Sequence, residues 1–551
     1  MFRAFYTLLS FAAAILPPVY ARAALITPSR MPASGWAGNV GVPGGIPTDY
    51  SVAYNVVQPM AGYPGPPADP TGAADSSPAI EYAVTHCPDK GCIYIPAGSY
   101  RLNSSIVRKG VNRYDNVQHP FSIVIRGDGP QRTRLRFYGS SGDILALRPA
   151  NGEDARTMAI AGGDARGSTS LVVDKIDSWL DRAPFWVTVN RVNSEAVAES
   201  VNGGRDPAYE RNTCSQIVRI TAIDRTTRTF TFVPALNEAH PSDSVTFCIS
   251  PPYRCGIEDL AVENMSDNGG HNIRIVSAKE CWIRNVESVR ASRYHIRLEA
   301  AFGCEVRDCV IHDAWEAGGN ADYGVGLYQW CSNNLVENNV AFHCRHSYVT
   351  EYGGQNNVIA YNCSKDPINE NQLTTDYLMG DLIHHGGEPR WNLWEGNVAG
   401  IIKFDCVLGG SAYNTAFRNF ILRSGLPPTT VACFGSDIQL WNYDANLVGN
   451  VYGVPPPLYV GPLRRWGSRQ DDTSVSDPLS QTSAFLDGET DRQTGRVLWS
   501  GADHTLPKSY YLKAKPGWFG DLPWPAFGPD CANAPSVKAI PAGCRYEAMN
   551  R

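Results

Sequence analysis

The stretch NNVIAYNC at residues 356–363 has two asparagines before a short apolar run and a third asparagine after it. The same arrangement recurs in NNLVENNV (333–340), NLWEGNV (392–398), NTAFRNF (414–420) and NLVGNVY (446–452). Looser copies, CWIRNVE and CEVRDCV, come before them at 281–287 and 304–310. Such repetition predicts a repeat architecture in which each copy belongs to one structural unit.

Aligning the copies places eight polar residues at one position of the repeat: Asp259, Asn285, Asp308, Asn339, Asn362, Asn397, Asn419 and Asn450. The steps between them are 26, 23, 31, 23, 35, 22 and 31 residues, so the longer steps contain the same unit with an inserted loop. Each unit is rich in β-forming residues and lacks helical spacing, which predicts a coil of short strands. Coils stacked about 4.8 Å apart would align these side chains into a structural ladder rather than a catalytic group.

The segment before the repeats gives a more specific indication of fold. GAADSSPAIEYAV (72–84), GCIYIPAGSYRL (91–102) and SIVIRGDGPQRTRLRF (122–137) follow one another there. This order resembles the opening of the pectate-lyase-like right-handed parallel β-helix proteins, in which a helix covers the end of the solenoid. The resemblance implies an all-β fold, a capping helix at 78–86 and action on carbohydrate. It does not imply one reaction, because this fold includes lyases, hydrolases, epimerases and phage tailspikes.

The remaining segments divide the chain by composition. Residues 1–23 have the pattern of a signal peptide cleaved after Ala23, so we expect a secreted or periplasmic protein without membrane insertion. An N-terminal extension at 24–70 precedes the predicted β-helix at 71–455. Alternating strands joined by a polar turn predict a small antiparallel β insert at about 151–250.

The Pro-rich and aromatic segment 456–551 is predicted to form a C-terminal cap. Its rings at Trp518, Phe519, Trp524 and Phe527 would either cover the open end of the solenoid or bind sugar.

Fifteen cysteines in an exported chain suggest disulfides, and the close pairs Cys87 with Cys92 and Cys531 with Cys544 are the first candidates. Cysteines at matching coil positions instead suggest stacking in the core: Cys281 with Cys304, and Cys309 with Cys363. CxxC and HExxH motifs do not occur, which argues against zinc. The net charge of -6, with both signs mixed along the chain, argues against nucleic acid as a partner.

Histidines are concentrated in the centre of the chain, where seven of the eleven lie between residues 271 and 385. Two long insertions, at 308–339 and 362–397, fall in the same region. Both follow the ladder position, so we expect them to rise from one side of the solenoid. The short coil between them, which contains HCRHSYVTEYGG (343–354), would form the floor of a groove.

Two strand registers are compatible with this region. One places Arg297, Tyr328, Glu351 and His384 at one outward position on successive rungs, with His295, Glu299 and Trp330 beside them. A slip of one residue selects His346, Tyr348, Tyr352 and His385 instead. Either register predicts an outward polar groove, because such residues are rarely buried without partners.

These residue types suit β-elimination on a polysaccharide that contains uronic acid. The reaction needs a base for the proton α to the carboxyl group, a cation for the developing negative charge and an acid for the leaving oxygen. The base would be His346 or His384, the cation an arginine and the acid a tyrosine. The catalytic candidates are His346, Tyr348, Glu351, Asp381, His384 and His385, and the substrate-binding candidates are His295, Arg297, Tyr328, Trp330, Arg345 and Arg390.

Two other functions stay open at this point. A glycoside hydrolase would use Glu351 with Asp381 or Glu388 as its carboxylate pair. A non-catalytic β-helix would bind the glycan without cleaving it. No metal ligand is assigned, although calcium is conceivable because Asp376, Asp381 and Glu388 offer oxygen ligands.

Overall fold

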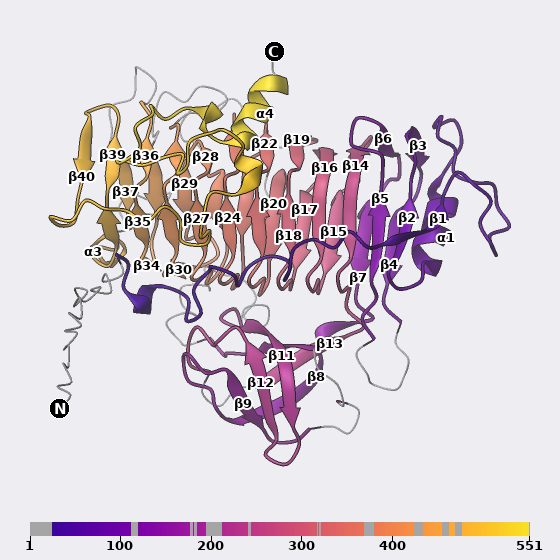
Figure 1. The fold of residues 1–551 in the computed structure, drawn as a ribbon, viewed down its shortest axis with the longest axis horizontal. Helices are drawn as coiled ribbons and strands as arrows, with labels where there is room; N and C mark the ends of the chain where they lie inside the picture. The colour runs from indigo at the N-terminus through magenta and orange to yellow at the C-terminus, as the bar shows by residue number, and fades with distance from the viewer. Residues whose placement is uncertain are drawn as a thin grey trace, which may run out of the picture.

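The computed structural model describes residues 25–549 except 112–118, 177–179, 181–184, 194–211, 241–243, 317, 319–320, 369–378, 424–433, 455–461 and 469–475. Within this range the chain winds into a long solenoid of parallel strands, seen lengthwise in Figure 1. The predicted parallel β-helix is therefore confirmed. The predicted signal peptide lies outside the described residues.

Each coil contributes strands to three parallel rows, which we call sheets 1, 2 and 3. Long strands on two early coils bend from sheet 1 into sheet 2, and they join the two rows into one hydrogen-bonded sheet. Sheet 1 contains β2 (Gly91–Tyr94), β5 (Ile123–Arg126), β14 (Gly256–Asn264), β16 (Trp282–Ala291), β18 (Glu305–Arg307), β21 (Leu335–Glu337), β24 (Val358–Ala360), β27 (Leu393–Glu395), β31 (Thr415–Phe417), β35 (Asn446–Val448) and β38 (Phe485–Asp487).

Sheet 2 follows sheet 1 in each coil. Besides the second halves of β14 and β16, it contains β3 (Gly98–Leu102), β6 (Thr133–Phe137), β19 (Val310–Ala314), β22 (Val340–Phe342), β25 (Cys363–Lys365), β28 (Val398–Ala399), β32 (Phe420–Ile421), β36 (Val451–Tyr452) and β39 (Glu489–Asp491).

Sheet 3 completes each coil and carries the histidine-rich region. It contains β4 (Ile106–Lys109), β7 (Leu145–Arg148), β15 (Ile273–Val276), β17 (Tyr294–Glu299), β20 (Tyr323–Tyr328), β23 (His346–Thr350), β26 (Leu382–His384), β29 (Ile402–Phe404), β33 (Ser436–Ile438) and β37 (Arg464–Trp466). Inward side chains of all three sheets form one continuous apolar core along the solenoid axis.

The asparagine ladder exists, but its upstream register differs from the predicted one. Nδ2 of Asn339 donates to Oδ1 of Asn362 at 2.9 Å, and equivalent bonds continue rung by rung through Asn397 and Asn419 to Asn450. The rung before Asn339 presents Cys309, whose backbone N–H donates to Asn339 Oδ1 at 2.9 Å. Asp308 is one residue earlier, in the left-handed region with φ of 58°.

The polar residues Asp259, Asn285 and Asp308 therefore belong to the neighbouring row, which turns the chain through positive φ. The buried ladder residues do not share that backbone conformation. A second ladder, not predicted, runs five residues ahead of the first through Asn334, Asn357, Asn392 and Asn414.

The predicted capping helix is α1 (Ser77–His86), which places Ile80, Ala83 and Val84 against the first coils. Ahead of it, β1 (Ser51–Asn55) pairs in parallel with β2. Figure 1 shows this helix at the end of the solenoid where the strands begin.

The N-terminal extension crosses the solenoid instead of remaining at its first coil. Residues 25–50 run along its length in the indigo segment of Figure 1. Near one end, Arg30 Nε donates to Asn446 Oδ1 at 2.7 Å. Further along, the Val42 N–H donates to Glu305 Oε1 at 3.0 Å. The segment therefore contacts coils that are hundreds of residues away in sequence, which composition alone did not reveal.

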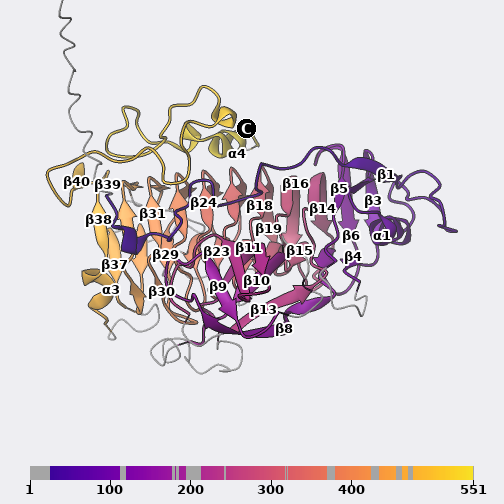
Figure 2. The ribbon, with the colours of Figure 1, turned by 60° about the horizontal axis from the view of Figure 1, so that its bottom comes forward.

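The predicted antiparallel insert is a closed six-stranded barrel that projects from the solenoid (Figures 1 and 2). It lies between β7 and β14 in sequence and has its own apolar core. Its strands are β8 (Asn151–Gly162), β9 (Ser170–Val173), β10 (Phe185–Val189), β11 (Gln216–Asp224), β12 (Thr229–Val233) and β13 (Ser244–Ile249).

The C-terminal prediction was wrong in two respects. The coils continue beyond residue 455, because β37, β38 and β39 extend all three sheets, and β40 (Arg496–Leu498) then pairs antiparallel with β39. The following segment, which ends in α4 (Pro541–Met549), lies along the side of the solenoid in Figures 1 and 2. Its rings pack there: Phe519 and Phe527 are buried, and Trp524 Nε1 donates to Tyr361 Oη at 2.9 Å.

The predicted disulfides are also absent from the described residues, where all fourteen cysteines are free thiols. Cys87 lies in the main core, whereas Cys92 packs on the outer face of sheet 1 beside Trp282. Cys531 and Cys544 donate to the separate carbonyls of Pro525 and Lys538. The solenoid core contains a cysteine stack in which the Cys281 N–H donates to Cys304 Sγ, as predicted. The predicted match of Cys309 with Cys363 was wrong, because Cys363 is in register with Val340 and packs outside this core.

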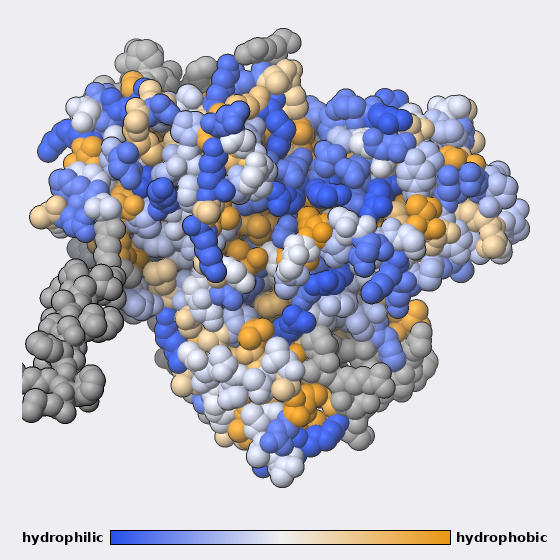
Figure 3. All heavy atoms as spheres, in the orientation of Figure 1, coloured by the Kyte–Doolittle hydropathy of each residue, from blue (hydrophilic) through white to orange (hydrophobic). Residues whose placement is uncertain are grey.

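No helix in the described ranges is long and apolar enough to span a membrane. The face of the molecule shown in Figure 3 is mainly hydrophilic, with apolar residues in scattered patches. Such scattering is normal for a folded surface and marks no binding site by itself.

Candidate active site

The first strand residues of β17, β20 and β23 bring three rings together on the outer side of sheet 3. Tyr294 is in register with Tyr323, and Tyr323 is in register with His346. The two tyrosine rings stack with centroids 4.5 Å apart, and the His346 ring lies 5.4 Å from Tyr323. Because the strands are parallel and in register, like positions repeat from rung to rung and form a continuous row of rings.

His346 is held as a neutral base. Its Nδ1 lies 2.6 Å from the carbonyl oxygen of Gly380, which can only accept, so Nδ1 carries the proton and Nε2 the lone pair. Burial, assisted by the positive charge of Arg345, lowers the pKa of His346 well below its usual range. The imidazole is therefore unprotonated at neutral pH and suited to accept a proton through Nε2.

A second imidazole has the opposite electrostatic environment. The ring of His385, directly after β26, lies 5.5 Å from that of His346. Its Nδ1 lies 2.5 Å from Oδ2 of Asp405. Burial opposes the charged form, but the carboxylate overcomes this effect and raises the pKa of His385. The site thus places a neutral imidazole beside one that is readily protonated.

Glu351 follows β23 and accepts a hydrogen bond of 2.5 Å from the Tyr294 hydroxyl. Burial raises the pKa of Glu351. Burial and the nearby Glu351 charge also raise the pKa of Tyr294 well above its usual range, so this phenol stays protonated. The same causes raise the pKa of Tyr323, which leaves a second phenol able to donate a proton.

Two arginines border the rings. The guanidinium of Arg297 lies 3.8 Å from the centroid of Tyr328, and its Nη2 is 3.2 Å from Oε2 of Glu299. The guanidinium of Arg345 lies 5.9 Å from the Tyr323 centroid. Planar guanidinium groups bind carboxylates with two parallel hydrogen bonds, so these side chains are suited to an acidic ligand.

The cluster is nearly closed to solvent, with exposed fractions of 2% for His346 and 8% for Arg297 and Arg345. Low polarity around charged groups strengthens their interactions with a bound ligand.

The barrel forms one border of the site. Beyond β20, the Trp330 Nε1 donates to the Asn212 carbonyl at 2.7 Å. On the next rung, Gln355 Nε2 donates to the carbonyls of Cys214 and Ser215 at 3.0 Å each. The insert therefore packs against the turns that follow the candidate strands, although it leaves the solenoid several rungs earlier.

Six of the sequence-predicted residues meet in this cluster: His346, Glu351, His385, Arg297, Tyr328 and Arg345. They combine members of both registers considered from sequence. Arg297 is in register with Gly326, and Tyr328 is in register with Glu299. Neither register is therefore correct throughout.

Four predicted residues point into the solenoid instead, and their assignment to a groove was wrong. His384 is in register with Thr350 and Phe404, and its Nε2 accepts from Trp394 Nε1 at 3.1 Å. Tyr348 belongs to the same apolar core. Polar side chains at inward positions of sheet 3 form hydrogen bonds in the interior. The polarity of a residue therefore did not indicate whether its side chain points inward or outward.

The other two inward residues are His295 and Asp381. Nδ1 of His295 lies 2.9 Å from Ser288 Oγ in the interior. The Asp381 carboxylate accepts the N–H groups of Gly400 and Ile401 at 2.6 and 2.7 Å. Asp381 therefore supports the next turn and cannot pair with Glu351 as a hydrolytic carboxylate.

Trp330 and Arg390 lie at the barrel interface and not in the cluster. Arg390 forms ion pairs with Glu388 and with Glu238 of the insert. Asp376 of the suggested calcium site lies outside the described residues. Of the other two suggested ligands, Asp381 accepts backbone N–H groups and Glu388 pairs with Arg390.

Sequence reasoning missed Tyr294, Tyr323 and Asp405. Tyr294 and Tyr323 stand 29 residues apart, and Tyr323 and His346 stand 23 apart. These steps are close to those of the repeat, so aligning the starts of the strands would have found the row. Asp405 gives no comparable signal, because its role depends on the fold that brings it to His385.

The His385–Asp405 pair makes stability depend on pH. The folded state raises the pKa of His385, so the resulting stabilisation is complete below the unfolded pKa and is lost as the pH rises through the folded pKa. Asp405→Asn should therefore cost more free energy of unfolding at pH 6 than at pH 9, measured by urea denaturation. Asp437→Asn is the matched control, because Asp437 pairs with Arg465, which does not titrate in this range. An equal cost of Asp405→Asn at both pH values would contradict the charged pair.

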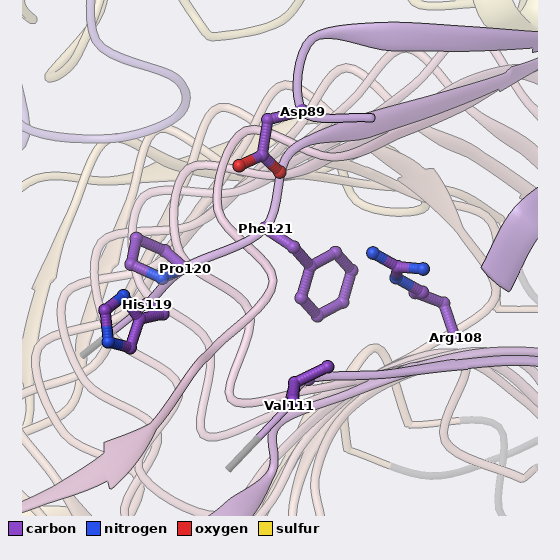
Figure 4. A pocket seen from close by; sticks show the side chains of 7 residues that line it. Asp89, Arg108, Val111, His119, Pro120 and Phe121 are labelled. Carbon is purple, nitrogen blue, oxygen red and sulfur yellow. The ribbon is translucent and has the colours of Figure 1, made fainter. Parts of the chain in front are cut away.

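A pocket of about 330 Å³ lies elsewhere, near the first coils. Figure 4 shows the Phe121 ring between Arg108 and His119 in this pocket. The Arg108 guanidinium lies 5.3 Å from the ring centroid. Asp89 also lines the pocket, which has no row of stacked rings like that on sheet 3 among its lining residues.

No protein-family model matches the chain, and no curated protein matches it. Among solved structures, the tailspike gp61 of Pseudomonas phage phi297 is 13% identical with a TM-score of 0.44, over 68% of this chain and 57% of the tailspike. The A-module of the mannuronan C-5 epimerase AlgE4 of Azotobacter vinelandii is 12% identical with a TM-score of 0.37, over 77% and 92%. Identities this low say nothing about its reaction.

A third solved structure is a mannuronic acid specific polysaccharide family 6 lyase from human gut microbiota. It is 10% identical with a TM-score of 0.33, over 71% of this chain and 76% of the lyase.

Proposed function

We propose that this protein is a secreted or periplasmic lyase that cleaves a uronic-acid-containing polysaccharide by β-elimination. The observation that carries the proposal is the fixed tautomer of His346, whose Nδ1–H donates to the Gly380 carbonyl and leaves Nε2 as a base. This base lies in one row with two protonated phenols and beside arginines. Those are the three kinds of group that the reaction requires.

In the proposed reaction, Nε2 of His346 removes the proton on the carbon α to the uronate carboxyl group. The arginines Arg345 and Arg297 bind the carboxylate, on which negative charge develops as the proton leaves. The bond from the β-carbon to the glycosidic oxygen then breaks, and the electron pair of the former C–H bond forms a double bond. Tyr323 donates its proton to the leaving oxygen and recovers it when the protonated His346 releases the proton it removed.

His385 and Glu351 would act through neighbouring groups. The charged form of His385, favoured by Asp405, discourages protonation of His346 in the resting state. Glu351 fixes the Tyr294 hydroxyl and so supports the ring stack. Hydrolysis is a weaker proposal, because Asp381 lies inside the solenoid and no carboxylate pair forms with it.

The proposal is tested by following the ultraviolet absorbance of an unsaturated uronate while counting reducing ends, with mature protein and a panel of uronate polysaccharides. We expect absorbance and reducing ends to rise together on at least one acidic polymer and on no neutral one. New reducing ends without absorbance would mean hydrolysis and would overturn the proposal. Measurable binding without either signal would favour the non-catalytic alternative.

A further inference from the structure

Three potential metal ligands from consecutive rungs meet inside the solenoid. His295 stands in β17, Asp322 directly before β20 and Cys344 two residues before β23. One ligand atom from each residue lies within 4.8 Å of the others, and all three residues have an exposed fraction of 0%. They are 27 and 22 residues apart in sequence, which are coil lengths rather than the spacing of a common zinc motif.

Two of the side chains are anchored through one atom and unpaired at the other. Ser288 Oγ lies 2.9 Å from Nδ1 of His295, and the backbone N–H of Arg345 donates to Oδ2 of Asp322 at 2.7 Å. His295 Nε2 and Asp322 Oδ1 have no hydrogen-bond partner among the described residues. Metal-binding sites show this pattern, in which an outer hydrogen bond orients each ligand and fixes the histidine tautomer.

Leaving these groups unpaired is energetically unfavourable in a closed interior. Each buried polar atom without a partner loses the hydrogen bonds that water provides in the unfolded chain. A bound cation would satisfy the orphaned atoms of His295 and Asp322.

We propose that His295, Asp322 and Cys344 bind one divalent transition-metal ion of the zinc type inside the solenoid. Nitrogen, oxygen and thiolate together are the donor set of zinc and exclude calcium, which takes oxygen ligands. Bonds of about 2.0–2.3 Å in a tetrahedral site require the three donors to approach each other by up to about 1.5 Å. Rotation of the Cys344 side chain and small shifts of the strand starts can provide this movement.

The ion would join the starts of β17, β20 and β23. Tyr294 and Tyr323 are next to two of the ligands in sequence, and His346 is two residues after the third. The proposed ion therefore lies directly behind the row of rings and would fix its spacing from the interior. This assignment does not depend on the proposed lyase activity.

The test is a Co²⁺ titration of tag-free mature protein that has been dialysed against a chelator. We expect one equivalent of Co²⁺ to bind and to produce thiolate-to-cobalt charge-transfer absorption. Cys344→Ser should abolish that absorption and weaken Co²⁺ binding at least 10-fold. Cys331→Ser is the matched control, because Cys331 is equally buried but donates only to backbone carbonyls, and it should behave as wild type.

A second readout keeps the test decisive if Cys344→Ser does not fold. The midpoint of thermal unfolding of wild type should rise when Zn²⁺ is added and fall again with chelator, because the ion binds only the assembled site. Wild type that binds no Co²⁺, or binds it without charge-transfer absorption, overturns the proposal. Folded Cys344→Ser that binds Co²⁺ as tightly as wild type overturns it as well.

Discussion

His346→Asn is expected to lower kcat/KM for β-elimination by roughly 100- to 10,000-fold, the usual contribution of a general base. Asparagine places an N–H close to the position of Nδ1, so the hydrogen bond to the Gly380 carbonyl is retained. It provides no basic atom in place of Nε2. The fold should therefore survive, KM should change little, and the loss should appear in kcat, measured from initial rates of unsaturated product formation.

The matched control is His384→Gln. Burial lowers the pKa of both histidines well below the usual range, yet His384 faces the core and hydrogen bonds to Trp394. This variant should lose stability. At a temperature where it is folded, it should keep kcat within about threefold of wild type, because the side chain at position 384 does not contact the substrate. If His346→Asn retained wild-type kcat, or if His384→Gln lost as much, His346 would not be the base.

Asn362→Ala is expected to lower the free energy of unfolding by at least about 3 kcal/mol. The side-chain oxygen Oδ1 of Asn362 accepts from the backbone N–H and the side-chain amide of Asn339, each at 2.9 Å. Its amide donates to the Val336 carbonyl at 2.9 Å and to Asn397 Oδ1 at 3.1 Å. Truncation removes four buried hydrogen bonds. The Asn339 backbone N–H is left unpaired, which costs about 1–3 kcal/mol, and each of the other three lost bonds costs about 0.5–1.5 kcal/mol, because the Asn339 amide keeps the Val306 carbonyl and Asn397 Oδ1 keeps the Asn362 backbone N–H. Urea denaturation followed by circular dichroism measures the change.

The neighbouring rung position offers a control that separates ladder bonding from burial. Asn356 is also buried, but its side-chain atoms have no hydrogen-bond partner within the described residues, and its φ is 56°. Glycine adopts this left-handed conformation without strain, so Asn356→Gly should cost less than about 1 kcal/mol. Equal losses for the two variants would show that the ladder contributes nothing specific.

Much of the fold could be predicted because its signals are local or periodic. The asparagines of NNVIAYNC repeat with the coil, and the helix before the first coil has a short amphipathic pattern. The upstream part of the ladder was predicted one residue too early. Asp308 was assigned to the ladder, but it pairs with Asn338 in the left-handed row that directly precedes the buried asparagines. Asparagine and aspartate suit both the left-handed turn and the ladder, so residue type did not separate the two positions.

The candidate site was predicted only in part, for the same physical reason. Successive residues of a strand point to opposite sides, so a one-residue change of register exchanges His384 for His385. In this chain both sides of sheet 3 carry polar groups: His384 hydrogen bonds inside, and His385 pairs with Asp405 outside. Hydrophobic patterning therefore did not indicate which histidine belongs to the site.

Strand propensity and repeat length are encoded within a few tens of residues, so the coils, the antiparallel insert and the histidine-rich region could be predicted from the chain. The folded structure was needed to show which side chains share a rung, where the barrel and the terminal segments pack, and that His295, Asp322 and Cys344 meet in the interior. Those contacts join positions separated by one coil or by several hundred residues. They depend on strand register and docking, which no local pattern in the sequence specifies.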